Sequence, residues 1–262
     1  MEQRQSKIQA AADRLWRSFT TGETCEPVRD LIGETDQETA YKVQEINVKR
    51  RMNRGEKPVG KKIGLTSFAV RKQLGVDQPD YGLLFHTTEV KNGGELSTME
   101  LLQPKAEAEI AFIVGKDLTG DVTMETLTDA IDYACASIEI VGSRVADWNI
   151  RITDTIADNA SASHYVLGDN QVSIDNLDLV NCKMSMTKND EVASEGSGKA
   201  CMDNPLNATL WLVQTMIKNG QPIRKGEVLL SGALGPMVNI SEGDHIKAEI
   251  EGLGSVEVRI SE

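Results

Sequence analysis

Apolar residues recur with helical spacing in two stretches near the N-terminus. Over residues 8–20 the spacing predicts a helix whose apolar face is formed by Ile8, Ala12, Leu15 and Phe19. A second helix is predicted to begin at Thr35, because Thr35 and Glu38 have the spacing of a capping box, and to continue toward Met52. Together these helices predict a helical N-terminal segment over residues 1–57.

Beyond residue 57, short apolar runs are separated by polar residues and frequent glycines, a texture typical of β-strands. The pattern predicts strands at 106–114, 136–142, 182–187, 191–195, 227–231, 245–251 and 255–260. Turn-forming residues at 189–190 and 252–254 predict that four of these strands form two hairpins.

Two further helices are predicted within this β-rich part, at 124–135 and 205–218. Asn204 is in position to cap the second of them, and Gly220 follows its end. The predicted buried face of that helix consists of Leu206, Leu210, Val213 and Ile217. The fold class is therefore predicted to be α+β, with the helical N-terminal segment packed on a mixed, mostly β domain over residues 58–262.

Composition and charge narrow the function classes. Hydrophobic residues make up 40% and charged residues 26% of the 262 residues, as in ordinary soluble proteins. Lys and Arg number 28 and Asp and Glu 40, and the net charge of −12 disfavours binding to nucleic acid or to anionic membranes. No apolar run approaches the ~20 residues that span a bilayer. The N-terminus does not resemble a signal peptide, so a cytoplasmic protein is expected.

Several common catalytic and cofactor motifs are missing from the sequence. The three histidines, His86, His164 and His245, stand apart, which disfavours a histidine-rich zinc site. The four cysteines form no C-x-x-C pair, so reduced thiols are expected. Neither G-x-S-x-G nor G-x-G-x-x-G is present, so serine hydrolase and dinucleotide chemistry have no support.

Carboxylates offer the remaining chemistry. Alternation along a strand places Lys105, Glu107 and Glu109 on one face, with about 6.6 Å between every second residue. Two such carboxylates can converge on Mg²⁺ or Mn²⁺, which prefer oxygen ligands. The segment 247–251 repeats the pattern, however, and a half-solvated strand explains both. Spacing alone therefore favours a solvent-exposed face.

Two single charged residues are further candidates. Glu139 lies in an apolar run, where burial without a partner is costly, although an exposed strand face explains it equally well. Lys61 and Lys62 point to opposite faces of a strand, so one could be desolvated and transfer protons, or both could be solvated at a sheet edge.

Six segments, taken in order, carry a resemblance to a known family. They are 59–66 (VGKKIGLT), 75–82 (GVDQPDYG), 103–110 (QPKAEAEI), 138–144 (IEIVGSR), 157–161 (ADNAS) and 231–237 (SGALGPM). With these segments the chain resembles the hydratase/decarboxylase branch of the fumarylacetoacetate hydrolase superfamily over nearly its whole length. The resemblance implies a mixed β fold around a Mg²⁺ or Mn²⁺ site in a homo-oligomer. Its implied metal ligands are Glu107, Glu109 and Glu139.

The same resemblance implies a substrate and a reaction. Lys62 and Asp80 match positions assigned to proton transfer, and Leu84 and Ser161 match positions at the substrate. The implied substrate is a small 2-hydroxy-2,4-dienoate or its 2-keto form. The implied reaction is hydration of 2-hydroxypenta-2,4-dienoate to 4-hydroxy-2-oxopentanoate in aromatic meta-cleavage catabolism.

Alternatives to this reaction remain open. A 4-oxalocrotonate decarboxylase would use the same metal site, and a subunit kept mainly as a binding partner would associate with other enzymes of the pathway. A C–C hydrolase of the superfamily is disfavoured, because no histidine lies in a motif that matches its water activator. Ser163–His164 and Asp203–Asn204 depart from the residues usual in the family, which leaves the substituent of the dienoate open.

Overall fold

The computed structural model describes residues 2–68, 71–72 and 76–262, and Gly75 of the second family segment lies outside them. Its helices are α1 (Glu2–Thr21), α2 (Arg29–Ile32), α3 (Gln37–Asn53), α5 (Met124–Ala130), α6 (Ile152–Ala157) and α7 (Pro205–Lys218). Its strands are β1 (Pro58–Gly64), β2 (Asp80–Phe85), β3 (Glu89–Val90), β4 (Glu95–Ser97), β5 (Lys105–Val114), β6 (Ile131–Val141), β7 (Ala162–Leu167), β8 (Lys183–Lys188), β9 (Glu191–Ser197), β10 (Val228–Leu230), β11 (Val238–Asn239), β12 (His245–Ile250) and β13 (Gly254–Ser261).

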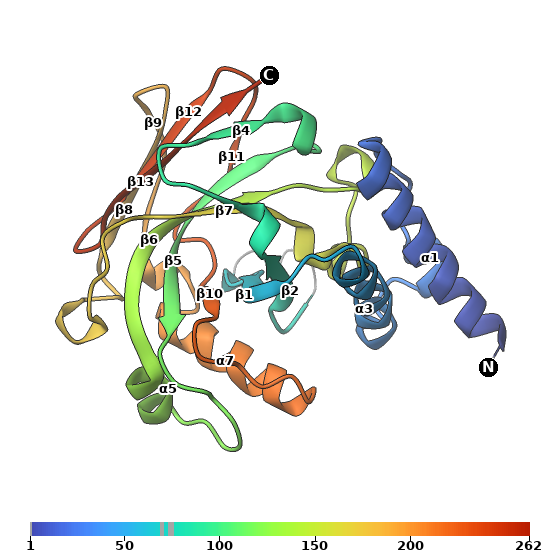
Figure 1. The fold of residues 1–262 in the computed structure, drawn as a ribbon, viewed down its shortest axis with the longest axis horizontal. Coiled ribbons are helices and arrows are strands. Elements are labelled where there is room, and N and C mark those ends of the chain that lie inside the picture. The colour runs from blue at the N-terminus through green and yellow to red at the C-terminus, as the bar shows by residue number, and fades with distance from the viewer. Residues whose placement is uncertain (1, 69–70, 73–75) are drawn as a thin grey trace.

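An eight-stranded mixed sheet forms the centre of the molecule (Figure 1). Its order is β2-β1-β10-β5-β6-β7-β3, with β11 paired to β5. Because β2 also contacts β7, the sheet curls back on itself and encloses one of its faces. A second sheet of five strands, β4-β13-β12-β8-β9, packs beside it. The α+β fold class predicted from the sequence is confirmed.

The main core lies on the outer face of the curled sheet. Fully buried side chains from β5, β13 and α7 meet there, among them Phe112, Val258 and Met216. The predicted bounds of α7 and its cap are confirmed: Asn204 accepts a hydrogen bond from the amide of Leu206. Its predicted buried face is partly wrong, because only Val213 of the four residues is fully buried. The other three are half-buried and pack against the same core.

Three predictions of helix ends are wrong. The helix predicted at 8–20 begins at Glu2, because the polar residues ahead of Ile8 give no periodic signal. The helix predicted at 124–135 ends at Ala130, because Ile131 already pairs with Val114 of β5 and strand pairing overrides helical spacing. The helix predicted to begin at Thr35 is capped by Asp36, whose carboxylate accepts from the amide of Thr39 at 3.0 Å. Apart from the early start of β6, the seven predicted strands are confirmed within two residues of each bound.

The N-terminal helices share a second core with α6. Buried apolar side chains of α1, α3 and α6 form this cluster, including Leu15, Val43 and Ile156. Figure 1 shows α1 and α3 side by side at one end of the molecule. The helices therefore reach the short helix that precedes the 157–161 segment. Among the described residues, none of the helices is both long and apolar enough to cross a membrane.

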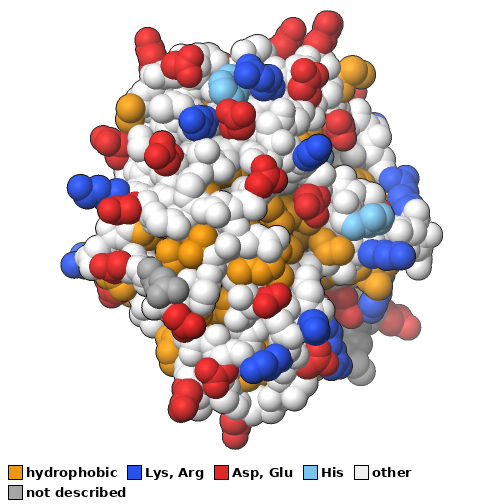
Figure 2. Space-filling model, turned by 60° about the vertical axis from the view of Figure 1, so that its left-hand side comes forward, with side chains coloured by type: hydrophobic (Ala, Val, Ile, Leu, Met, Phe, Trp, Pro, Cys, Tyr) orange, Lys and Arg blue, Asp and Glu red, His pale blue; other side chains and the backbone are white. Residues whose placement is uncertain are grey.

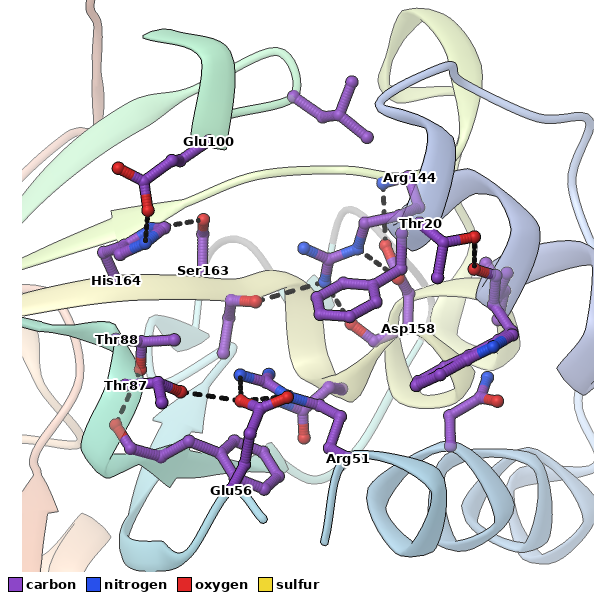
Figure 3. A pocket seen from close by; sticks show the side chains of 18 of the residues that line it. Thr20, Arg51, Glu56, Thr87, Thr88, Glu100, Arg144, Asp158, Ser163 and His164 are labelled. Atoms are coloured by element: carbon purple, nitrogen blue, oxygen red, sulfur yellow. Dashed lines mark hydrogen bonds and ion pairs between the residues drawn. The ribbon is translucent and has the colours of Figure 1, made fainter. Parts of the chain in front are cut away.

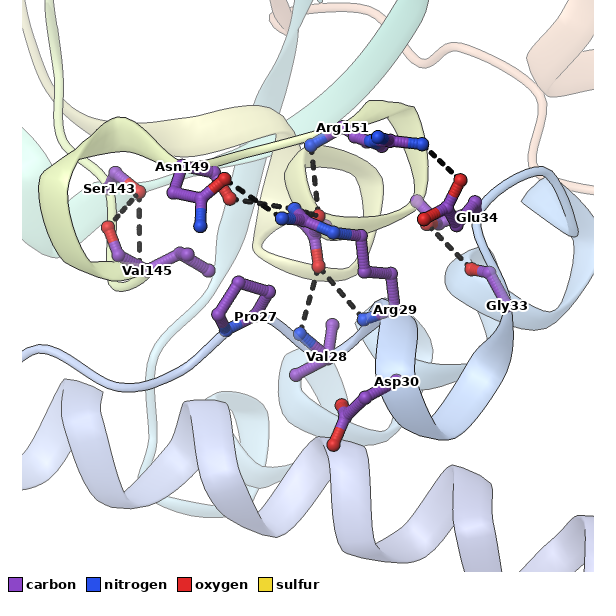
Figure 4. Close-up of polar contacts among 12 residues, drawn as sticks. Pro27, Val28, Arg29, Asp30, Gly33, Glu34, Ser143, Val145, Asn149 and Arg151 are labelled. Atoms are coloured by element: carbon purple, nitrogen blue, oxygen red, sulfur yellow. Dashed lines mark hydrogen bonds and ion pairs between the residues drawn. The ribbon is translucent and has the colours of Figure 1, made fainter.

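Asp154 fixes α6 to the N-terminal segment. One carboxylate oxygen accepts from the amides of Val28 and Arg29 at 2.8 and 2.9 Å. The other accepts from the amide of Arg151 at 2.9 Å and pairs with the guanidinium of Arg29 at 2.5 Å. Thr153 adds a bond to the carbonyl of Gly33 (Figure 4). Asp154 is completely buried, so its bonds are shielded from water.

Acidic side chains are spread over the surface. Figure 2 shows one face on which Asp and Glu surround a central area of apolar side chains, with Lys and Arg scattered singly among them. This distribution agrees with the net charge of −12.

We expect Asp154→Asn to destabilise the protein by about 3 kcal/mol, because an amide nitrogen would face backbone N–H donors in a buried site. The free energy of unfolding from urea titration measures the effect. The matched control is Asp30→Asn, which removes an exposed ion pair with Arg14 and should cost less than about 1 kcal/mol. Equal losses in the two variants would contradict the anchoring role of Asp154.

Candidate metal and substrate site

Strand pairing brings three glutamates together on the enclosed face of the sheet. In the antiparallel register of β5 and β6, Glu107 lies opposite Glu139 and Glu109 opposite Ser137. Paired residues point to the same side of a sheet, so the carboxylates converge. Each of the three offers an oxygen, and these oxygens all lie within 4.8 Å of one another.

Several oxygens of these carboxylates lack a hydrogen-bond donor in the described part of the chain. Glu109 and Glu139 are completely buried. One oxygen of Glu109 accepts from the amide of Gly232 at 2.8 Å, whereas its other oxygen has no hydrogen-bond donor among the described residues. Neither oxygen of Glu139 accepts a hydrogen bond from them, although one lies 3.0 Å from the ammonium of Lys62. Buried carboxylate oxygens without donors are costly, and a divalent cation would satisfy them. The donor set therefore fits a hard cation such as Mg²⁺ or Mn²⁺.

Position 232, whose amide donates to Glu109, requires glycine. Gly232 has a φ of +102°, and a Cβ there would lie 2.4 Å from the Thr66 side chain. Only glycine allows its amide to approach the carboxylate in this conformation.

Burial raises the pKa of all three carboxyl groups. The pKa of Glu107 rises to about 7, with the charge of Glu139 adding to the effect of burial. The pKa of Glu109 rises well above its usual value for the same reasons, and that of Glu139 is also raised. Lys62 opposes each shift. Without a cation, the cluster therefore holds protons near neutral pH.

The similar segment at 247–251 differs in the exposure of its glutamates. Glu249 and Glu251 are exposed, since β12 buries only its apolar face. β5 is covered on both faces from Ala108 onward, so Glu109 is enclosed and Glu107 is half-buried. The two segments therefore differ in whether the face that carries the glutamates is covered, and residue spacing alone does not reveal this.

Both adjacent lysines of β1 are buried, and Lys62 is the one that faces the glutamates. Its Nζ lies 3.0 Å from Glu139 Oε1 and donates to the carbonyl of Ala160 at 2.9 Å. Lys61 points to the other face and pairs with Glu227. Burial alone would lower the pKa of Lys62, but the charges of the surrounding acids, Glu139 first, raise it. Lys62 is therefore a charged ammonium in the site.

Asp80 lies at the start of β2, paired with Gly64 at the end of β1. Burial raises its pKa to about 6, which Lys62 partly opposes and Glu139 increases. One of its oxygens accepts from the hydroxyl of Thr155 at 3.4 Å. A Cβ at Gly64 would lie 2.2 Å from the other oxygen, so glycine makes room for the carboxylate.

The two predicted substrate residues occupy different surroundings. Ser161 is buried, and its hydroxyl lies 3.2 Å from that of Thr155. Leu84 is on the same face of β2 as Gly82, the residue opposite Lys62, but belongs to an apolar cluster with Tyr165 and Leu230. Thr155, which joins Asp80 to Ser161, was not found by sequence reasoning, since a threonine ahead of the 157–161 segment carries no signal.

A cavity of about 510 Å³ lies between the N-terminal helices and β7 (Figure 3). The three glutamates are not among its lining residues, but Asp158 and Asn159 are. Ser163 and His164 also line it, with Ser163 Oγ 2.9 Å from His164 Nδ1. Burial lowers the pKa of His164 to about 4, so it is neutral at pH 7. The Ser163–His164 departure thus faces this cavity.

Comparison with known proteins finds one matching family and several similar hydratases. Residues 68–261 match the sequence model of a family described as fumarylacetoacetate (FAA) hydrolase C-terminal. The chain is 51% identical over 254 residues to TodF product hydratase of Pseudomonas putida, which covers 97% of this chain and 95% of the relative. It is 47% identical to 2-keto-4-pentenoate hydratase 1 of Dechloromonas aromatica, over 95% of each chain.

A solved structure extends the comparison to the fold. The 4-oxalocrotonate decarboxylase of Pseudomonas putida G7, complexed with magnesium and adipate, superposes with a TM-score of 0.93. The two chains are 31% identical, and the match covers 98% of each.

The raised pKa values predict that metal binding depends on pH. At pH 6 Glu107 and Glu109 hold protons that a cation must displace, so we expect the Kd for Mg²⁺ to fall about tenfold or more between pH 6 and pH 8. Isothermal titration calorimetry in two buffers measures the affinity and the protons released. Glu249→Gln is the control and should bind Mg²⁺ as the wild type does. An affinity independent of pH would contradict this assignment.

Whereas the affinity for Mg²⁺ should increase with pH, the stability of the metal-free protein should decrease with pH. The folded state binds these protons more tightly than the unfolded chain, so it loses stability as the pH rises from the usual glutamate value toward about 7. We expect the Tm to fall over this range and to recover on addition of Mg²⁺, as differential scanning calorimetry would show. A Tm that rises over the same range would contradict the raised values.

Proposed function

Because the chain belongs to the fumarylacetoacetate hydrolase family, we propose that its glutamate cluster holds Mg²⁺ or Mn²⁺ and that it hydrates 2-hydroxypenta-2,4-dienoate. The observation that carries the proposal is the set of three convergent carboxylates with unsatisfied oxygens, placed beside a buried lysine. Relatives at 51% and 47% identity are named as hydratases, which supports this reaction over others on the same fold.

Glu107, Glu109 and Glu139 would hold the cation in this proposal. When bound, a divalent cation would attract the substrate carboxylate and stabilise the negative charge that develops on the 2-oxygen. The carboxylates keep the site anionic, and Lys62 offsets part of their charge.

Lys62 and Asp80 are the proposed proton-transfer pair. In the first step the 2-hydroxyl loses its proton and C5 gains one, which gives the conjugated 2-keto-3-enoate. In the second step water adds its hydroxyl at C4 and a proton at C3. Asp80, with a pKa of about 6, can accept and return a proton near neutrality, and Lys62 can donate one. Lys62 and Asp80 are both buried, which would limit the access of other water to these steps.

The second candidate is the decarboxylation of 4-oxalocrotonate. The observation that favours it is the close structural similarity to a decarboxylase, at a TM-score of 0.93. The hydratase is preferred because the hydratase relatives share more of the sequence. Both reactions need the same metal site, so only products distinguish them.

The test begins with metal-stripped protein and 2-hydroxypenta-2,4-dienoate. We expect the absorbance of the dienol to decay only after Mg²⁺ is added, with 4-hydroxy-2-oxopentanoate as the product. Glu109→Gln should lower kcat/KM at least about a hundredfold, because it removes a ligand oxygen. Glu249→Gln is the matched control and should be fully active. If the protein instead releases CO₂ from 4-oxalocrotonate and leaves the dienoate unchanged, the decarboxylase is the correct assignment.

Asp80→Asn tests the proton-transfer role separately. The amide keeps the shape of the side chain but cannot accept a proton, so we expect kcat to fall about 10²–10³-fold while Mg²⁺ affinity stays within about threefold. Steady-state kinetics and calorimetry on the same preparation give both values. A variant with wild-type kcat would exclude Asp80 from the chemistry.

A further inference from the structure

Three consecutive residues after α6 have left-handed backbone conformations. Asn159, Ala160 and Ser161 have φ angles of +55°, +51° and +57°. Residues other than glycine rarely adopt this region, at a cost of roughly 1–2 kcal/mol each. Strain of this kind persists only where the surroundings impose it, and it is often associated with function.

The strained conformation aims two groups at the site. The carbonyl of Ala160 accepts from the ammonium of Lys62 at 2.9 Å. The hydroxyl of Ser161 meets that of Thr155, which in turn contacts Asp80. Within the described part of the chain, the ammonium of Lys62 contacts this carbonyl and the carboxylate of Glu139, so the carbonyl helps to set the direction in which the ammonium points.

The side-chain amide of Asn159 holds this conformation from one side. Its nitrogen donates to the carbonyl of Leu83 at 2.9 Å, and its oxygen accepts from the amide of Leu83 at 2.8 Å. The amide thus pairs with β2 as a neighbouring strand would. A Cβ at Gly82 would lie 2.2 Å from the carbonyl oxygen of Asn159, so glycine allows this close approach.

A buried ion pair holds the preceding residue. The carboxylate of Asp158 accepts from the amide and Nε of Arg144 at 2.9 and 2.5 Å. The same guanidinium donates to the carbonyls of Asp158 and Ala162, on either side of the strained residues. Figure 3 shows Arg144 and Asp158 facing each other at the wall of the cavity.

We propose that Asn159 is a positioning residue for Lys62. Its amide holds residues 159–161 in the left-handed conformation, and the Ala160 carbonyl then directs the Lys62 ammonium toward the substrate. The inference rests on the proposed function for its kinetic readout, and on structure alone for the second readout below. Asn159 itself touches neither the glutamates nor Lys62 through its side chain, so it acts through the loop.

The test compares three variants at Asn159 with a control. Asn159→Ala removes both bonds, Asn159→Asp keeps only the acceptor, and Asn159→Gly removes both bonds while relieving the backbone strain. We expect all three to lower kcat about 10–100-fold, with KM within about threefold and Mg²⁺ affinity unchanged. Asn170→Ala, which loses one amide-to-carbonyl bond far from the site, should keep the wild-type kcat.

Each outcome decides the proposal. If the glycine variant retains the wild-type kcat, or if the variants lose only thermal stability, Asn159 does not position Lys62. Crystal structures of Asn159→Gly and the wild type provide the readout that needs no substrate: in the variant, Lys62 Nζ should leave hydrogen-bond range of the Ala160 carbonyl. A contact retained at 2.9 Å would overturn the inference. If the wild-type protein is inactive on the dienoate but Lys62 is displaced in Asn159→Gly, the inference stands and only the proposed function is refuted.

Discussion

The enclosed cluster of three carboxylates is the constraint on which the site depends. Like charges within 4.8 Å of one another in a buried position cannot all remain ionised unless positive charge lies among them. Lys62 supplies one such charge, and a divalent cation would supply the rest. Two glycines serve the buried acids: Gly64 leaves the space that Asp80 occupies, and Gly232 lets its amide reach Glu109.

The N-terminal helices support this site from a distance. They share a core with α6, and Asp154 joins that helix to the backbone of Val28 and Arg29. α6 carries Thr155 and leads into the strained residues that meet Lys62. A helix of six residues has little stability of its own, so its position comes from these contacts. The helical segment is thus part of the scaffold of the site.

Much of the fold could be predicted from local patterns, and less of the site. Alternation placed Glu107 and Glu109 on one face correctly, but the register that brings Glu139 opposite Glu107 depends on pairing that no local pattern reports. The exposed pair Glu249 and Glu251 shows that spacing does not reveal which faces are enclosed. Helical spacing also misassigned residues 131–135, where pairing with β5 decides the structure. The resemblance to a family, and not the spacing, selected the three glutamates as metal ligands. The contacts of Thr155 and Asn159 could be found only in the three-dimensional structure.

The bonds of Asp154 also have a consequence for how the chain assembles. Its partner Val28 lies 126 positions earlier, and the Asn159–Leu83 and Lys62–Ala160 contacts span 76 and 98 positions. During synthesis the apolar faces of the first helices therefore emerge long before α6 exists to cover them. Contacts of such separation slow folding, because long loops must close before any of them contributes. A nascent chain that stops short of residue 154 lacks the helix that completes this core, so part of the apolar surface of the N-terminal helices stays exposed until α6 is made.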